Sequence, residues 1–106
     1  MQVQVNFADV KGSESLEQHI REELERSIGR YATRITRVEV HVSDHNGVKH
    51  SPNDKRCLME ARPAGHEPFV IEHHGDDFFA VVSVGADKLE RVLSKHFDKL
   101  NEHHPH

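Results

Sequence analysis

The stretch TRVEVHVSD, residues 36–44, alternates polar and apolar side chains with a period of two. That period is typical of a β-strand with one buried and one solvated face. Val38, Val40 and Val42 are therefore predicted to face a core, while the side chains between them face solvent. The stretch predicts a strand near the middle of the chain, and the segments on either side decide which elements share its core.

The segment before this strand carries a helical pattern. Ser13 is a predicted N-cap, because a serine side chain can accept a hydrogen bond from the first helical turn. Behind it, apolar residues recur at spacings of three and four over about five turns, which predicts one amphipathic helix. They are Leu16, Ile20, Leu24, Ile28, Tyr31 and Ile35. Before the helix, residues 2–7 (QVQVNF) alternate like the central stretch, so a first strand is predicted there.

The segments after the central strand predict two more strands and a second helix. Residues 45–54 are dense in turn formers and predict a hairpin connection. Residues 55–62 and 69–74 are strand candidates, separated by the turn formers PAGHEP. GDD at 75–77 then predicts the cap of a long helix whose buried stripe comprises Val82, Ala86, Leu89, Leu93, Phe97 and Leu100. The tail from about residue 102 to 106 is expected to fray.

The order of elements, β-α-β-β-β-α, predicts an α+β fold. Its simplest form is a two-layer sandwich in which two helices pack on one face of a four-stranded sheet and the other face is solvated. A length of 106 residues fits one domain, residues 1–106. No apolar run approaches the roughly 18 residues of a membrane-spanning helix. The single cysteine, Cys57, fits a reducing compartment, so a cytoplasmic protein without a membrane partner is expected.

The predicted second helix carries a basic row in a chain whose formal net charge is −4. At the helical angle per residue the row lies on the side away from the apolar stripe, and it consists of Lys88, Arg91, Lys95 and Lys99. Two interpretations stay open from the spacing alone. Either this is a solvated face paired with Glu90 and Asp98, or it is a row that binds phosphates.

Metal binding and catalysis have less support. The chain holds eleven histidines, but the adjacent His73 and His74 would point to opposite faces of a strand, and the spacings of zinc motifs are missing. Cys57 fits a small core residue better than a nucleophile, and Asp76 and Asp77 are explained by helix capping. We therefore predict no metal, no cofactor, no catalytic residues and no enzymatic activity.

The stretch DDFFAVVSVGADKLERVLSKHFDK, residues 76–99, resembles the signature of the ribosome hibernation-promoting factor and ribosome-associated inhibitor family. The matching positions are Asp77, Phe79, Ala80, Lys88, Leu89, Arg91, Leu93, Lys95, His96 and Lys99. The segments MQVQVNF, SESL and RITRVEVHVSD also resemble that family's first strand, helix start and second strand. The resemblance therefore covers nearly the whole chain.

This resemblance implies a fold similar to double-stranded RNA-binding domains and a non-enzymatic role in translation regulation. Family members sit in the mRNA and tRNA channel of the small ribosomal subunit and silence idle ribosomes under stress or in stationary phase. By that resemblance rRNA is the partner and DNA is not. The rRNA-binding residues would be Lys88, Arg91, Lys95, His96 and Lys99, with Arg26 and Arg30 as weaker candidates.

The chain also departs from the family pattern. Glu17 and Glu23 stand where the family often has cations, and Phe97 stands where it has a second lysine after the Lys-His pair. Each missing phosphate contact lowers affinity. Two alternatives therefore stay open, a protein-interaction or stress module of the same fold without rRNA binding, and a histidine-rich metal-binding protein. Longer family members dimerise ribosomes through a further C-terminal domain, and none is expected here.

Overall fold

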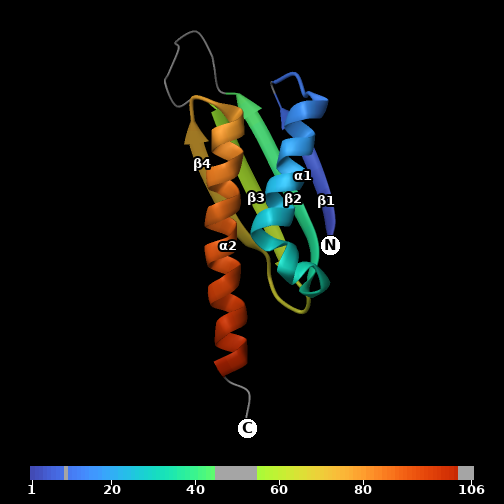
Figure 1. The fold of residues 1–106 in the computed structure, drawn as a ribbon, viewed down its shortest axis with the longest axis vertical. Coiled ribbons are helices and arrows are strands. Elements are labelled where there is room, and N and C mark those ends of the chain that lie inside the picture. The colour runs from blue at the N-terminus through green and yellow to red at the C-terminus, as the bar shows by residue number, and fades with distance from the viewer. Residues whose placement is uncertain (9, 45–54, 103–106) are drawn as a thin grey trace.

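A computed structural model describes residues 1–8, 10–44 and 55–102 of the chain. The predicted order of strands and helices is confirmed, with one short 3₁₀ helix, η1, added after the first helix (Figure 1). The elements are β1 (Gln2–Ala8), α1 (Glu14–Ile28), η1 (Gly29–Arg34), β2 (Ile35–Asp44), β3 (Lys55–Pro63), β4 (Phe69–Gly75) and α2 (Phe78–Glu102). The predicted turn at 45–54 and the last four residues of the predicted tail lie outside the described residues, and α2 continues through Glu102.

The four strands form one mixed sheet in the order β1-β2-β3-β4. The first two strands are parallel, as a helical crossover between them requires, and the other neighbours are antiparallel. Val40 is opposite Val5 on one side and Met59 on the other, and Met59 is opposite Ile71. The register therefore lines up one apolar row across all four strands on a single face.

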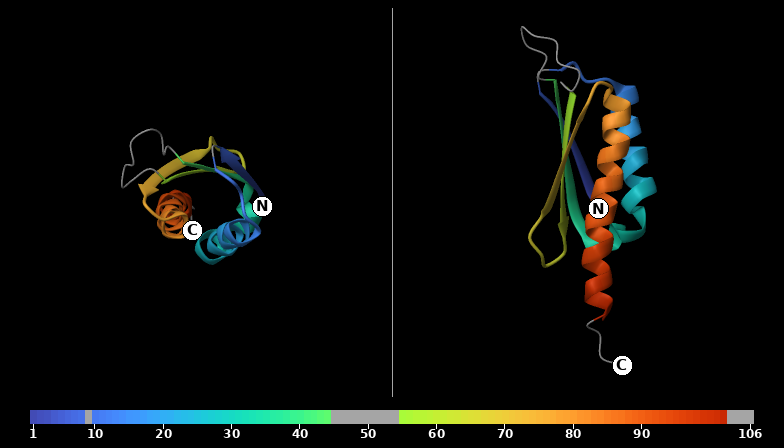
Figure 2. Two further views of the ribbon diagram at one scale, coloured as in Figure 1. Left: turned by 90° about the horizontal axis from the view of Figure 1, so that it is seen from above. Right: turned by 90° about the vertical axis from the view of Figure 1, so that its left-hand side faces the viewer.

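Both helices cover that apolar face, which confirms the predicted two-layer α+β sandwich (Figure 2). The predicted stripe of α2 is buried from Val82 to Phe97. Leu100 is the exception, because 46% of its surface is exposed. The last turns of α2 run past the end of the sheet, so no strand is there to cover Leu100 (Figure 1).

The first helix ends earlier than its apolar pattern predicts. The cap at Ser13 is confirmed, since its Oγ accepts a hydrogen bond from the Leu16 amide at 3.1 Å. The single helix predicted through Ile35 is wrong, because α1 stops at Ile28 and Ile35 is the first residue of β2. A spacing of three suits a 3₁₀ helix as well as an α-helix, and Gly29 disfavours continued α-helix. The pattern could not distinguish the two.

The second helix is capped as predicted. The Oδ2 atom of Asp77 accepts a hydrogen bond from the Ala80 amide at 3.2 Å, and the Asp77 carbonyl accepts one from Val81 at 2.9 Å. Asp77 therefore has a structural role at the start of α2. Within the described residues, no helix is long and apolar enough to cross a membrane.

Candidate nucleic-acid interface

The basic row lies on the solvent side of α2. Arg91, Lys95 and Lys99 are exposed, and Lys88 is half-buried with its Nζ donating to the backbone carbonyl of Glu72 at 3.2 Å. The interpretation that Glu90 and Asp98 pair with this row is wrong for Glu90, which binds Arg30 instead. In the part of the chain that the structure describes, Arg91, Lys95 and Lys99 form no ion pair. Their charges face solvent without a carboxylate partner.

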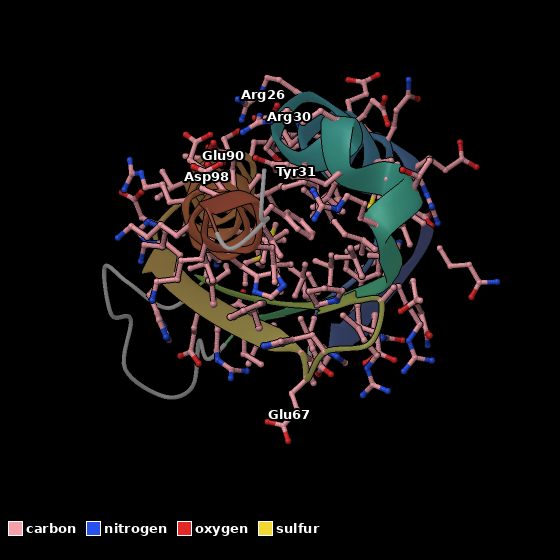
Figure 3. All side chains as sticks on the ribbon, turned by 90° about the horizontal axis from the view of Figure 1, so that it is seen from below. Arg26, Arg30, Tyr31, Glu67, Glu90 and Asp98 are labelled. Atoms are coloured by element: carbon pink, nitrogen blue, oxygen red, sulfur yellow. The ribbon has the colours of Figure 1, made fainter. Side chains whose placement is uncertain are left out.

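The arginines Arg26 of α1 and Arg30 of η1 are arranged differently. Arg26 pairs with Asp87 of α2 at 2.9 Å and with Glu23 at 2.7 Å. Arg30 pairs with Glu90 at 3.0 Å, and Figure 3 shows both arginines reaching from the first helix and η1 toward α2. Hydrogen bonds to these carboxylates raise the pKa of each guanidinium. Arg26 and Arg30 therefore tie the two helices together with charges that are already balanced.

Two acidic departures from the family pattern act on neighbouring arginines. Glu23 hydrogen-bonds Arg26, and its own pKa is lowered, first of all by that bond. Glu17 pairs with Arg21 at 3.2 Å. Each substitution therefore adds a negative charge and also engages a positive one, which leaves α1 with little free positive charge for a polyanion.

His96 follows Lys95 in the sequence, but its imidazole does not add to the positive charge of the basic row. Its ring faces the β3–β4 turn, with the His66 ring centroid at 4.4 Å and that of Phe69 at 5.1 Å. Burial, then the neighbouring His66, then Arg34 lower the pKa of His96 below its usual value. The side chain is therefore neutral at physiological pH and is available as a flat ring rather than as a cation.

Phe97 is a core residue, as the apolar stripe predicts, with 3% of its surface exposed. Tyr31 of η1 packs against it with a centroid distance of 4.7 Å, and the Arg34 guanidinium lies over its ring. A positive charge is thus held beside Phe97 by a residue of another element. Sequence reasoning missed this role for Arg34, because it placed the residue in an uninterrupted helix.

The histidines and the cysteine that were considered as metal ligands or as a nucleophile lie in environments that do not suit those roles. His73 lies on the inner face of β4 opposite Cys57, where burial lowers its pKa, and His74 lies on the outer face beside Glu72. Cys57 is fully buried, which raises its thiol pKa to about 12. Among the residues with described positions, no group of three or more potential ligands is arranged to hold a metal.

Residues 3–101 match the protein family described as Sigma 54 modulation protein / S30EA ribosomal protein. The chain belongs to this family. The match confirms the resemblance found in the C-terminal segment. No curated protein matches the chain in sequence.

Solved structures of other proteins share the fold. A ribosomal subunit interface protein from Coxiella burnetii superposes with a TM-score of 0.77 at 20% identity, covering 92% of this chain and 99% of that one. The N-terminal domain of Protein Y from Thermus thermophilus superposes with a TM-score of 0.72 at 15% identity, covering 91% and 99%. At these identities the two structures support the architecture of the family.

The structure brings the predicted site residues into two neighbouring areas, except for Lys88, which bonds the backbone of β4. Arg91 lines a shallow depression between the helices together with Arg26 and Arg30, next to the paired carboxylates Asp87 and Glu90. Lys95, His96 and Lys99 instead line a groove on the other side of α2, with two rings that the sequence did not single out, His66 and Phe69. The available signal was the segment PAGHEPF, which places a histidine and a phenylalanine three residues apart around a turn.

Proposed function

We propose that this protein is a non-enzymatic translation modulator in the cytoplasm. It binds the small ribosomal subunit through rRNA in the mRNA and tRNA channel, and it inactivates or protects idle ribosomes under stress or in stationary phase. One observation carries the proposal: family membership coincides with a row of cations on α2 whose charges have no carboxylate partner among the described residues. Lys88, Arg91, Lys95 and Lys99 contact phosphates in this proposal.

The physical basis is phosphate neutralisation. A row from Lys88 to Lys99 extends about 16 Å along a helix, which suits contact with a backbone rather than with one base edge. Such contacts release counterions, so affinity falls as salt rises. With a formal net charge of −4, the protein as a whole carries the wrong sign of charge to attract a polyanion. The charge distribution therefore favours approach with α2 facing the rRNA.

The test is cosedimentation with purified small subunits over a range of salt concentrations. Wild type binds at low salt, and each lysine that contacts a phosphate contributes about 1 to the slope of log affinity against log salt. Lys95→Glu and Lys99→Glu lower both affinity and slope. Lys11→Glu makes the same charge change at an exposed lysine far from the row in sequence, so it serves as the matched control. Equal losses from Lys11→Glu and Lys95→Glu would contradict the assigned helix.

A second candidate is a protein-interaction module of the same fold. The internal pairing of Arg26 and Arg30 favours it, because these arginines are then less available to rRNA. Affinity capture from stressed cells distinguishes the two functions. Recovery of one protein partner without rRNA supports the second candidate, whereas recovery of rRNA that is lost with Lys95→Glu supports the first.

A further inference from the structure

A groove of about 440 Å³ lies between the β3–β4 turn and α2. The turn side contributes the rings of His66 and Phe69. The helix side contributes Val92, Lys95, His96 and Lys99, whose spacings of three, one and three place them on one helix face. The groove therefore combines three flat rings with two exposed lysines.

The side of the groove that is formed by the rings of His66 and Phe69 is preformed. Gly65 adopts a φ of +72°, a left-handed conformation that glycine reaches without steric strain. The turn is held by the His66 amide bonding the Pro63 carbonyl at 3.2 Å, and by the Ala64 amide bonding the Arg34 carbonyl at 2.9 Å. The turn can therefore present its side chains in one arrangement.

The orientation of His66 is fixed as well. Its Nδ1 lies 2.7 Å from the carbonyl of Glu67, and a carbonyl can only accept, so Nδ1 carries the proton. The ring lies nearly parallel to that of Phe69, at 10° and a centroid distance of 5.0 Å. His96 closes the cluster at 4.4 Å from His66. A planar ligand would meet aromatic surface that needs little reorganisation.

We propose that this groove binds an unpaired RNA base, stacked on the rings of His66, Phe69 and His96, while Lys95 and Lys99 contact the flanking phosphates. Such a combination of stacking rings and cations is how proteins hold single-stranded nucleic acid. This inference rests on the proposed function, because it gives two of its phosphate-binding lysines a neighbouring base. It adds a preference for unpaired bases, which a row of cations alone does not supply.

The charge pattern favours a nucleotide over an apolar peptide. Among the described residues, no carboxylate lines the groove, and Glu67 in the adjoining turn points away from the molecule (Figure 3). The depression between the helices differs, since two of its three arginines, Arg26 and Arg30, pair with Asp87 and Glu90. Unbalanced positive charge beside one exposed ring and two partly exposed rings matches a ligand that is both planar and anionic.

Binding of this kind selects RNA structure. A base inside a continuous duplex is stacked on its neighbours and cannot enter a groove between protein elements. Loops, bulges and strand ends offer unstacked bases next to a phosphate backbone. The full protein is therefore expected to prefer an RNA with an unpaired nucleotide over a perfect duplex of equal charge.

The test uses a short single-stranded RNA with one fluorescent adenine analogue, 2-aminopurine, whose emission is quenched by stacking. Wild type quenches the emission. His66→Ala and Phe69→Ala remove a stacking surface, so quenching disappears and affinity falls by roughly 5- to 150-fold. Phe69→Tyr keeps a ring and retains quenching. Lys95→Glu weakens binding, but the RNA that binds at saturation is still quenched.

Two controls separate stacking from folding. His66 is exposed, so its truncation leaves the core intact, and an unchanged melting temperature verifies this. Val70 is next to Phe69 in sequence, but it is 55% exposed and lies on the opposite face of the sheet. Val70→Ala should therefore leave RNA binding unchanged. Quenching that is lost equally in Val70→Ala and His66→Ala would overturn the proposal.

The remaining outcomes distinguish this inference from the proposed function. If both ring variants bind small subunits and RNA as wild type does, the base-binding groove is overturned while rRNA binding stands. If wild type quenches the RNA but never cosediments with small subunits, the groove stands and the ribosomal function fails. If an acidic peptide with one aromatic residue binds and the protein does not quench the emission of the RNA, the groove is a protein-binding site and the proposal is overturned.

Discussion

The Arg34 guanidinium lies 4.0 Å from the centroid of the Phe97 ring. This contact joins the end of η1 to the C-terminal half of α2, and it holds a cation against Phe97, the position at which the family resemblance leads one to expect a lysine. A cation over an aromatic face at a partly exposed site contributes about 0.5–1 kcal/mol. The departure at Phe97 therefore adds to the core and also positions a charge supplied by another element.

The first prediction concerns the end of the buried stripe. Phe97→Ala should lower the free energy of unfolding by about 3–5 kcal/mol, because it leaves a cavity between α2 and η1. Leu100→Ala should change it by no more than about 0.5 kcal/mol, since nearly half of the surface of Leu100 is exposed. Urea denaturation of both variants measures the difference. Similar losses would show that Leu100 has a covering partner in solution.

The second prediction concerns the ion pairs between the helices. Asp87→Asn should release Arg26 from one of its two carboxylates and raise the affinity for small subunits, with a steeper dependence on salt. Asp98→Asn is the matched control, because it removes one negative charge from α2 without breaking an ion pair of the described residues. Cosedimentation at several salt concentrations compares them. Equal effects would mean that overall charge matters and that release of the arginine does not.

The same pairs should contribute little to stability. Both arginine side chains are about half exposed, and solvent screens such pairs to about 0.2–1 kcal/mol. A double-mutant cycle with Arg30→Ala and Glu90→Ala measures the coupling from unfolding free energies. A coupling well above that range would show that the two helices depend on the pair for their packing.

The third prediction is a loss of stability in mild acid. The pKa values of His96 and His73 are lowered in the folded state, chiefly by burial, so the unfolded chain binds protons more readily. The stabilisation is present above the unfolded value of about 6.5 and is lost as pH falls below it. Melting temperature should therefore drop between about pH 7.5 and pH 5.5. His96→Gln should reduce that drop, and an identical drop in both proteins would contradict this assignment.

The fourth prediction concerns the buried thiol. Burial raises the pKa of Cys57 to about 12, so the native thiol should resist alkylation at neutral pH and react fully in denaturant. Because the unfolded thiol ionises near 9, stability should fall as pH rises from about 9 toward about 12. Thiol labelling and melting curves of wild type and Cys57→Ala check both statements. Rapid labelling of the folded protein would exclude a closed core around β3.

The strands were predictable because each exposes one face and buries the other. Val38, Val40 and Val42 alternate with polar residues, and that alternation determines which face of the sheet they occupy. The end of α1 was not predictable, because Ile28 and Tyr31 are three residues apart in both kinds of helix. The exposure of Leu100 depends on where the sheet ends, which is a property of other segments.

The candidate site was predictable only in part for a similar reason. The row on α2 follows from spacing within one helix. The pairing of Arg30 with Glu90 joins residues 60 positions apart, and it decides which cations remain free. The meeting of His66 with His96 depends on the course of the β3–β4 turn. Local patterns identify the residues of one element, whereas contacts between elements determine their chemistry.

The projecting end of α2 gives the two ends of the basic row different mechanical properties. Lys88 stands on turns that are braced by β4, whereas Lys99 stands on turns that extend past the sheet (Figure 1). Helical turns without tertiary packing fray in water, and ordering them costs conformational entropy. In the proposed complex, a phosphate contact at Lys99 is therefore expected to contribute less to affinity than the same contact at Lys88. We therefore expect binding to begin at the rigid end of the row, near Lys88, and the turns around Lys99 to become ordered on contact.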